Sequence, residues 1–416
     1  MNAGSSKELD IVIDELPAPR PSLRLSVVSE TYPPEVNGVA RTIACVVEGL
    51  RSRNHDLQLV RPQQPGDGSA DTMPRFHEVL MRGLPIPRYP HLRVGLVSTR
   101  RLVSLWSRRR PDLVHIATEG PMGWSALQAA TRLRIPVCSD FRTNFHAYSK
   151  HYGIGWLHKP IMSYLRKFHN QTACTMVPDD GLRQQLMDYG FRNVVTVARG
   201  VDATQFDPRL RSEDLRRAWG VLPQDLVVLH VGRLAAEKNL ATLQEAFAAI
   251  QRVIPRSRLV VVGDGPSARE VQRACPSAIM AGMRHGAELA AHYASGDLFL
   301  FPSVTETYGN VTAEAMASGL PVLAFDYAAA SRLIVDGVNG ATVHFGDQAA
   351  FIARASALAC QPEALRGMGR RARQTAEAQR WESVVESLET IYRTVIDAAA
   401  HSPAALTSRR PAWLGA

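Results

Sequence analysis

The alternation of apolar and polar positions predicts strands and helices in turn from residue 23 onward. Residues 23–29 form a short apolar run of β-favouring side chains, and apolar residues then recur at helical spacing over residues 36–50. The same step recurs with an expected strand at 112–118, a helix around 123–134 and a strand at 135–139. Strands that alternate with helices in this way indicate a parallel sheet covered on both faces. The first half therefore predicts a doubly wound α/β domain.

The second half of the chain restarts this pattern. The expected elements are strands at 225–231, 257–262, 297–301 and 320–324, with helices at 239–253 and 310–318. Beyond Asp347 the pattern becomes helical, with helices expected at 349–359, 363–379 and 381–398. Two successive α/β patterns in one chain predict two Rossmann-like domains.

These elements predict a division of the α/β chain into five segments. They are a disordered tail at 1–22, a first Rossmann-like domain at 23–200, a second at 201–380, a C-terminal helix at 381–398 and a frayed tail at 399–416. A chain of 416 residues, at roughly 150 residues per domain, is long enough for two such domains.

Composition excludes several other classes of protein. With 45% apolar and 21% charged residues the chain is neither disordered nor collagen-like nor a coiled coil. Its five cysteines are scattered with no Cys-x-x-Cys pair, so they encode neither a disulfide framework nor a zinc knuckle. No window offers the roughly 18 uninterrupted apolar residues of a membrane-spanning helix, and the first residues lack a signal-peptide pattern. We therefore expect a cytoplasmic protein.

The net charge of +9 comes from two segments of the first half. Eight Arg and no acidic residue lie between Val79 and Pro111, and five Lys or Arg and no acidic residue lie between Phe141 and Pro178. Basic residues interleaved with aromatic ones, such as Trp106, suit adsorption to an anionic membrane surface. A solvated face is the alternative. Nucleic acid is not an expected partner, because no nucleic-acid-binding motif accompanies the charge.

Candidate chemistry lies in the loops that follow the expected strands, because ligands of parallel sheets bind at the carboxyl ends of the strands. In the first such loop, Gly38 at a helix start lets backbone N–H groups approach an anion, although a turn alone could also require glycine. In a second loop, Arg233 and Lys238 precede a helix and suit a pyrophosphate clamp; a solvated loop is the alternative.

A third loop carries two carboxylates separated by seven residues. Glu306 is expected in the loop and Glu314 about one turn into the following helix, so that both can face one site and accept hydrogen bonds from sugar hydroxyls. Backbone N–H groups of Asn310 and Val311 can meet phosphate at the helix start. A solvated helix position is the alternative for Glu314, but the apolar residues beside it argue against that reading.

Together these segments resemble the retaining, nucleotide-sugar-dependent glycosyltransferases of family 4, which have the GT-B fold. The resemblance extends from residue 23 to about residue 392 and includes the loop at 33–38 and the segment at 337–340. In detail, the sequence most resembles bacterial GDP-mannose-dependent α-mannosyltransferases and the sulfoquinovosyl-diacylglycerol synthase group. The resemblance implies two Rossmann-like domains that face each other across a cleft, with a C-terminal helix that crosses back to the first domain.

The resemblance also implies a role for each candidate. The donor diphosphate would be held by Gly38, Arg233, Lys238, Asn310 and Val311. Glu306 would bind the transferred sugar and Glu314 the ribose hydroxyls. Positive side chains take the place of a metal in such enzymes, so neither a metal nor a cofactor is expected, and the nucleotide sugar is a substrate.

Two further segments are less specific. Gly263, Asp264 and Gly265 would lie near the nucleobase, although many proteins use such a turn only for its backbone shape. Arg142 stands where close relatives carry a histidine; it could stabilise developing charge, and His146 could occupy the space or only pack there or contact the acceptor. In a front-face retaining mechanism the leaving phosphate takes the acceptor proton, so no protein base is required.

We therefore predict a retaining, metal-independent hexosyltransferase that moves mannose from GDP-mannose to a hydroxyl of a lipid or lipid-linked glycan. Glucosyl or sulfoquinovosyl transfer from a UDP-sugar is the first alternative. A nucleotide-sugar epimerase and a non-catalytic, basic lipid-binding or nucleic-acid-binding protein are rivals from other classes. Because the basic first domain would bind the acceptor, we expect peripheral association with the inner face of the cytoplasmic membrane.

Overall fold

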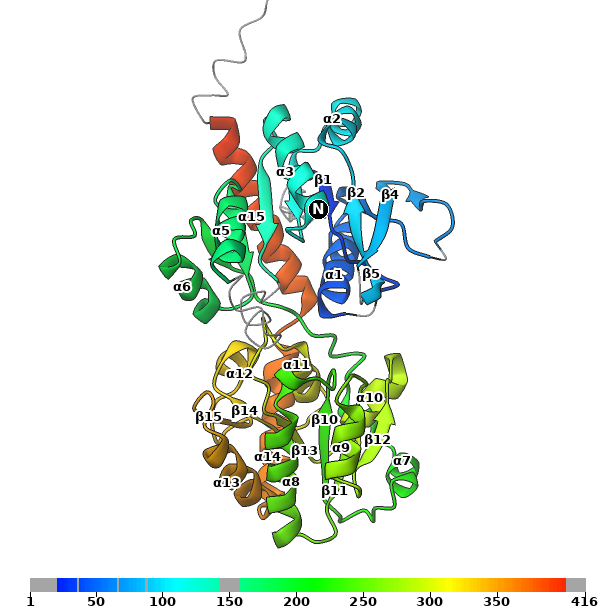
Figure 1. Cartoon of the computed structure of the whole chain (residues 1–416), viewed down its shortest axis with the longest axis vertical. Helices are drawn as coiled ribbons and strands as arrows, with labels where there is room; N and C mark the ends of the chain where they lie inside the picture. Colours follow the sequence, from blue (N-terminus) through cyan, green and yellow to red (C-terminus); the bar gives the residue numbers. More distant parts are fainter. Residues whose placement is uncertain (1–20, 36, 66, 87–88, 143–157, 402–416) are drawn as a thin grey trace, which may run out of the picture.

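The computed structural model describes residues 21–35, 37–65, 67–86, 89–142 and 158–401, and the account below is confined to them. Two lobes, each built on one sheet, lie end to end (Figure 1). Most of the two expected tails, 1–20 and 402–416, falls outside the described residues.

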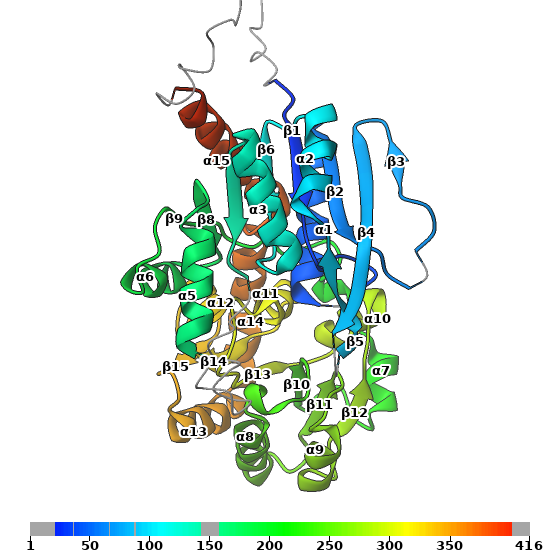
Figure 2. The same ribbon diagram turned by 45° about the horizontal axis from the view of Figure 1, so that its top comes forward.

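The first lobe is built on a sheet of nine described strands. Their order is β3-β4-β2-β1-β6-β7-β8-β9, with β5 paired to β4. The strands are β1 (Arg24–Val28), β2 (Asp56–Pro62), β3 (Thr72–Met73), β4 (Phe76–Ile86), β5 (Tyr89–Leu96), β6 (Leu113–Ile116), β7 (Val137–Asp140), β8 (Cys174–Val177) and β9 (Val194–Thr196). Its helices are α1 (Gly38–Ser52), α2 (Thr99–Arg108), α3 (Pro121–Leu133), α5 (His158–His169) and α6 (Asp180–Asp188). Among the strands described, β3 and β5 alone pair antiparallel, both with β4 (Figure 2).

The second lobe is built on six described strands, all parallel, in the order β12-β11-β10-β13-β14-β15. The strands are β10 (Val227–Val231), β11 (Arg258–Val262), β12 (Ile279–Gly282), β13 (Leu298–Phe301), β14 (Val322–Phe325) and β15 (Ala341–Val343). The helices are α7 (Glu213–Ala218), α8 (Leu240–Val253), α9 (Ala268–Ala274), α10 (Gly286–Ala294), α11 (Asn310–Ala317), α12 (Ala328–Leu333), α13 (Gln348–Ala359) and α14 (Pro362–Glu377).

Strand β10 shows why such apolar runs form central strands. All five of its residues are buried, with Val227 and Leu229 in the apolar core on one face of the sheet and Val228 in the core on the other. Successive side chains of a strand point to opposite faces, so a strand covered by helices on both sides must be apolar throughout. The two Rossmann-like lobes expected from the sequence are therefore confirmed.

The last helix, α15 (Trp381–His401), leaves the second lobe and packs on the first (Figures 1 and 2). Its buried residues Val385, Leu388 and Tyr392 share one apolar core with α1 and with strands of the first sheet. The two helices approach closely at Gly49, where a Cβ atom would lie 2.5 Å from a methyl group of Val385. The predicted return of the C-terminal helix to the first lobe is confirmed.

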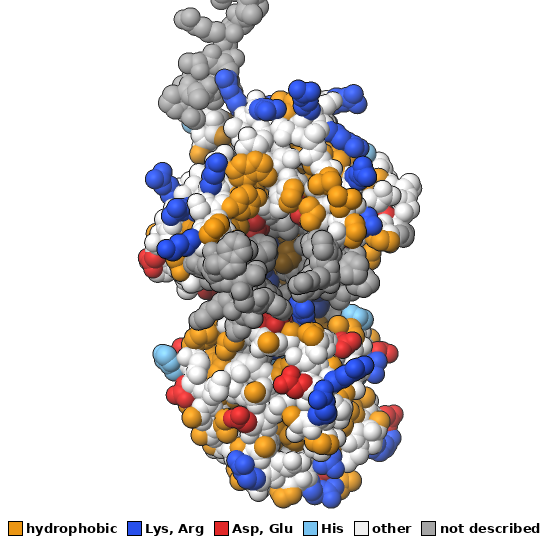
Figure 3. Space-filling model, viewed as in Figure 1, with side chains coloured by type: hydrophobic (Ala, Val, Ile, Leu, Met, Phe, Trp, Pro, Cys, Tyr) orange, Lys and Arg blue, Asp and Glu red, His pale blue; other side chains and the backbone are white. Residues whose placement is uncertain are grey.

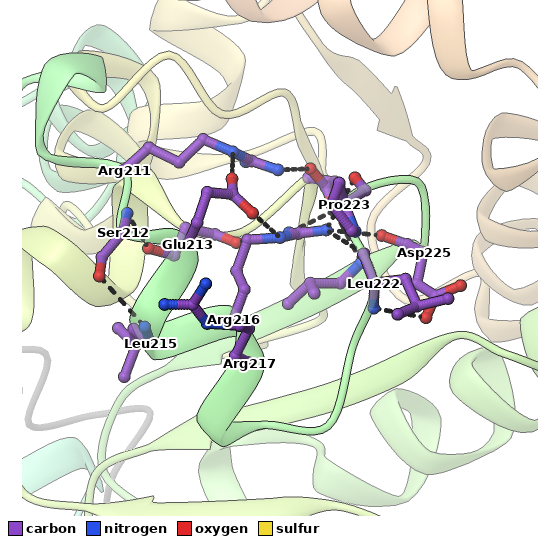
Figure 4. Close-up of polar contacts among 12 residues, drawn as sticks. Arg211, Ser212, Glu213, Leu215, Arg216, Arg217, Leu222, Pro223 and Asp225 are labelled. Carbon is purple, nitrogen blue, oxygen red and sulfur yellow. Dashed lines mark hydrogen bonds and ion pairs between the residues drawn. The ribbon is translucent and has the colours of Figure 1, made fainter.

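A buried arginine in α7 connects this first helix of the second lobe to residues that precede two strands of its sheet (Figure 4). The side chain of Arg216 is 1% exposed and donates to the backbone oxygens of Ser295 and Asp225 at 2.9 and 2.8 Å. It also donates to the carboxylate of Asp297 at 2.9 Å. The carboxylate of Glu213 lies 3.8 Å from its Nε. Buried charges need partners of this kind, so Arg216 ties α7 to the loop before β10 and to the edge of β13.

One part of the charge interpretation was wrong. Trp106 does not face outward: it is fully buried in the core between α2 and the first sheet, where its Nε1 donates to Gln58 at 2.9 Å. Phe168 of α5 is also buried, whereas Tyr164 on the same helix is 41% exposed. The apolar face of each helix covers the sheet, and this requirement decides where the aromatic residues point. Within the described residues, no helix is long and apolar enough to cross a membrane.

We expect Leu388→Ala to lower the free energy of unfolding by about 2–5 kcal/mol, because it removes a fully buried side chain from the core that joins α15 to the first lobe. Urea denaturation of the whole chain measures this effect. The matched control is Ser387→Ala, one residue earlier on the exposed face, which should change stability by less than about 0.5 kcal/mol. Equal stability of both variants would contradict the packing described for α15.

Candidate active site

Each sheet contains a point where the strand order reverses, and both points lie where the lobes meet. In the second sheet this switch point falls between β10 and β13, whose following loops carry Lys238 and Glu306. In the first sheet it falls between β1 and β6, whose following loops carry Glu30 and Glu119. Open α/β sheets bind ligands at such points, outside the carboxyl ends of the strands. The topology therefore identifies two halves of one candidate site.

Lys238 and Glu306 form an ion pair in the second lobe. The Glu306 carboxylate also accepts a hydrogen bond from Ser303 at 2.6 Å, and the Lys238 ammonium lies 5.6 Å from the centre of the Phe301 ring. The two charged side chains are only 14% and 13% exposed. A cation and an acceptor of hydrogen bonds are thus held together in a largely water-excluded place, where each charge counts for more than in water.

Glu314 lies on the buried side of α11 and is contacted from both lobes. Its Oε1 accepts from Arg41 of α1 at 2.8 Å, and its Oε2 accepts from the hydroxyl of Tyr293 at 2.9 Å. Arg41 also donates to Gln205 at 2.9 Å. Burial raises the pKa of Glu314, and the positive charge of Arg41 opposes that rise. The sequence-based alternative, a solvated helix position for Glu314, is therefore wrong.

The start of α11 lies beside groups from the first lobe and from the connection between the lobes. Gly309, with φ of 89°, turns the chain into the helix, which begins at Asn310. The side chain of Asn310 accepts a hydrogen bond from Arg199 at 3.1 Å, and its amide nitrogen is 3.5 Å from the position a Cβ atom would take at Gly38. Val311 follows in the first turn of the same helix. The structure thus brings Gly38 and Asn310 close to each other.

Arg233 and the glycine turn occupy the neighbouring loops. The Arg233 side chain is 43% exposed, and its Nη1 lies 3.9 Å from the carboxylate of Glu237. Gly263, with φ of 132°, approaches the preceding loop so closely that a Cβ atom would lie 2.0 Å from the oxygen of Gly232. The backbone oxygen of Asp264 accepts from the N–H of Leu234 at 2.9 Å.

A Cβ atom at Gly265 would likewise lie 2.3 Å from the oxygen of Leu234. The turn therefore fixes the loop of Arg233, which is a structural reason for its glycines.

In the first lobe, Arg142 is paired with Asp140 at the end of β7. The distance is 2.5 Å, and the same carboxylate lies 2.8 Å from Nε2 of His115, whose Nδ1 is 2.8 Å from the hydroxyl of Tyr392. Burial alone would raise the pKa of Asp140, but Arg142 and His115 outweigh it and hold the pKa at about 2. His115 is a core residue, as its place in an apolar strand indicates. His146 lies outside the described residues.

The switch point of the first sheet carries one buried and one half-buried carboxyl group, Glu119 and Glu30, that sequence reasoning missed. Burial raises the pKa of Glu30 to about 7, although its carboxylate accepts from the N–H of Met122 at 2.7 Å. Burial raises the pKa of Glu119 to about 8, and the charge of Glu30 adds to this rise. Glu119 is 4% exposed, and its Oε1 has no partner among the described residues. Both residues lie in the loops that follow strands β1 and β6, a signal that could have identified them.

Arg41 and Arg199 were missed for another reason. Their partners Glu314 and Asn310 lie 273 and 111 residues away in the chain, so no local pattern points to the contacts. Among the described residues, no group of three or more His, Cys, Asp or Glu side chains is arranged to hold a metal ion.

Comparison with known families covers both lobes. Residues 36–205 match the family described as Glycosyltransferase Family 4, and residues 225–361 match glycosyl transferases group 1. A GDP-mannose-dependent alpha-mannosyltransferase of Mycobacterium tuberculosis is 35% identical over 329 residues, which cover 78% of this chain and 85% of that protein. Sulfoquinovosyl transferase SQD2 of Arabidopsis thaliana is 31% identical over 316 residues, covering 74% of this chain and 61% of that protein.

A solved structure agrees in its architecture. Sucrose-phosphate synthase from Thermosynechococcus elongatus matches 90% of this chain and 100% of its own with a TM-score of 0.72, at 17% identity. The likeness shows that the two chains share a fold, the GT-B arrangement of two Rossmann-like domains expected from the sequence.

The raised pKa of Glu119 predicts a stability that depends on pH. Between the usual pKa of 4.5 and about 8, the folded protein keeps a proton that the unfolded chain releases, so the free energy of unfolding falls as pH rises through this range. Glu119→Gln stays neutral and should be more stable than the unchanged protein by on the order of 3–5 kcal/mol at pH 8, with a far smaller difference at pH 5. Denaturant unfolding at several pH values measures this. Glu363→Gln, at an exposed position of α14, is the control, and a gain for Glu119→Gln that does not change with pH would contradict the assignment.

Proposed function

We propose a reaction for this chain, which belongs to glycosyltransferase family 4: it transfers a mannosyl unit, with retention of configuration, from GDP-mannose to a hydroxyl of a lipid or glycan acceptor. The observation that carries the proposal is the Lys238–Glu306 pair, at the switch point of the second sheet and in the loop that leads into α11. The mannosyl donor is supported by the printed name of the relative that is 35% identical.

The donor would lie across the second switch point. Lys238 and Arg233 would offset the charge of the diphosphate, which increases on the leaving group as the sugar departs. The N–H groups of Asn310 and Val311 at the start of α11 would donate to phosphate oxygens, because the first N–H groups of a helix have no partner within it. Gly38, without a side chain, would leave room for the phosphates on the other side.

The two carboxylates of the second lobe would hold the two sugars of the donor. Glu306 would accept hydrogen bonds from hydroxyls of the transferred sugar, with Lys238 kept beside it. Glu314 would accept from the ribose hydroxyls; two of the roughly four acceptor positions of its carboxylate are taken by Arg41 and Tyr293.

Retention would follow from attack on the same face as departure. The bond between the sugar's anomeric carbon and the phosphate oxygen breaks, the bond to the acceptor oxygen forms, and the acceptor proton passes to the departing phosphate. No protein base is then required. Arg142, held by Asp140, would stabilise negative charge near the reacting sugar.

The acceptor would enter from the first lobe. Glu30 and Glu119, at the switch point of its sheet, offer carboxyl oxygens to a hydroxyl-bearing acceptor, as carboxylates do when they bind sugars or polyols. A second candidate reaction is the transfer of a sulfoquinovosyl or glucosyl unit from a UDP-sugar, which the likeness to the Arabidopsis sulfoquinovosyl transferase favours.

A membrane surface is the proposed source of the acceptor. Lys and Arg side chains are spread over the face of the first lobe seen in Figure 3, with few acidic ones among them. Exposed members include Arg100, Arg101 and Arg108 of α2 and Lys167 of α5, near the exposed ring of Tyr164. This surface would place the enzyme at the inner face of the cytoplasmic membrane.

We expect Glu306→Gln to lower the rate of sugar transfer from GDP-mannose by about 100-fold or more, because it removes the charge that accepts the sugar hydroxyls and that pairs with the Lys238 ammonium. Transfer of labelled mannose to an extract of membrane lipids measures the rate, with UDP-glucose as the competing donor. Glu363→Gln is the surface control and should transfer normally. An unchanged transfer rate in Glu306→Gln would show that Glu306 does not bind the transferred sugar. Transfer from UDP-glucose but not from GDP-mannose would favour the UDP-sugar reaction.

The membrane proposal predicts a loss of vesicle binding for Arg100→Ala combined with Arg101→Ala. Each basic residue near an anionic surface contributes about 1 kcal/mol, so partition onto phosphatidylglycerol vesicles should fall roughly 30-fold. Sedimentation with vesicles at low and high salt measures it. Arg269→Ala combined with Arg273→Ala, exposed on α9 of the second lobe, is the matched control. Equal losses for both pairs would contradict a specific membrane-facing surface on the first lobe.

A further inference from the structure

Three arginines of the described chain are buried, and one of them differs from the other two. Arg61 donates to the carboxylates of Asp67 and Glu78, each at 2.7 Å. Arg216 has a carboxylate and several backbone oxygens around it, as Figure 4 shows. These two side chains are structural, because every charge is met by a partner.

Arg199 is 5% exposed, yet the one hydrogen bond that it forms within the described residues goes to a neutral amide, the Oδ1 of Asn310 at 3.1 Å. Its Nε and Nη2 are buried without a partner, and within the described residues it forms no ion pair with a carboxylate. Burial lowers the pKa of Arg199 to about 9, and the positive charge of Arg142 adds to the effect. Leaving a guanidinium in this state costs folding free energy, since buried charges are normally paired.

The groups around the Arg199 guanidinium indicate that an anion would be its partner. The residue follows β9 in the connection between the lobes, and its guanidinium carbon lies 5.4 Å from the centre of the Tyr308 ring. It contacts the first residue of α11, where helix N–H groups favour an anion, and Gly38 borders the same Asn310 side chain. The partnerless donors thus lie beside the groups proposed to hold the donor diphosphate.

We propose that Arg199 is a phosphate-binding residue whose counter-charge is supplied by the substrate: its Nε and Nη2 donate to the diphosphate of the bound nucleotide sugar. This inference rests on the proposed function. It adds to the proposed diphosphate site a third cation, which lies in the connection between the lobes rather than in a loop of the second sheet. A planar guanidinium matches phosphate oxygens through two parallel donors, which a lysine at this position would not do.

Because its partner comes with the substrate, Arg199 should lower the stability of the ligand-free protein and raise its affinity for the diphosphate. Residues retained for binding at a cost in stability show this signature. Its neighbours in the chain are fixed: a Cβ atom at Gly200 would lie 2.7 Å from the Trp381 ring, and the N–H of Val201 donates to Gln379 at 2.9 Å. Binding at Arg199 would therefore act on the segment where the chain crosses between the lobes.

The test compares Arg199→Met with the unchanged protein in two measurements. Thermal unfolding without ligand should show equal or higher stability for Arg199→Met, whereas Arg216→Met, the matched buried arginine, should be destabilised. Calorimetric titration should show GDP binding 10- to 100-fold weaker in Arg199→Met, with the affinity for guanosine changed less than about threefold. Arg199→Lys should bind GDP with intermediate affinity. The same titrations use UDP and uridine.

Two results would overturn the inference. If Arg199→Met binds the nucleoside diphosphate as tightly as the unchanged protein, or loses stability as Arg216→Met does while diphosphate and nucleoside affinities fall together, Arg199 is structural. In either case the proposed function stands, because the unchanged protein binds the diphosphate. If the unchanged protein binds neither GDP nor UDP, the proposed donor site itself is wrong, and the role of Arg199 falls with it.

Discussion

The arrangement of the molecule depends on one packing requirement: the last helix must cover a face of the first sheet. Apolar side chains of β1, β2 and α1 share one core with α15, which contributes Val385, Leu388 and Tyr392. The chain therefore crosses between the lobes twice, once on leaving β9 and once on entering α15. The two crossings touch, since the N–H of Val201 donates to Gln379. This doubled connection holds the carboxyl ends of both sheets toward each other and brings α1 against α11.

Apart from Arg199, three cations at this junction are paired with carboxylates across or within the lobes. Lys238 is held by Glu306, Arg41 by Glu314 and Arg142 by Asp140. Each pairing reduces the cost of burying a charge, and it orients a side chain that we propose to contact the substrate. The carboxyl groups of Glu30 and Glu119 in the first lobe differ from these pairs. Burial favours their protonated forms, so their pKa values are raised to about 7 and 8.

Much of the fold could be predicted from sequence because parallel strands leave a strong pattern. β10, β11 and β13 are buried on both faces and so appear as continuous apolar runs, and the expected bounds of these strands differ from the observed ones by one or two residues. Glu306 and Glu314 could be identified because they flank one short loop. Arg41 and Arg199 could not, because their partners are brought near only by the crossing of the chain. Trp106 was misplaced because a basic segment was taken as one surface, whereas the amphipathic helix α2 buries one side of it.

If Glu314 binds the ribose as proposed, its contact with Arg41 links substrate binding to the position of the lobes. Glu314 belongs to the second lobe, but its carboxylate remains an effective acceptor because a cation of the first lobe lies 2.8 Å away and opposes the rise in its pKa. If the lobes separate, that cation leaves, and a buried carboxylate without it favours the protonated form, which is a poorer acceptor for ribose hydroxyls. By reciprocity, a nucleotide that binds the ionised carboxylate must favour the joined lobes by the same free energy. The site is therefore complete only where the two sheets face each other.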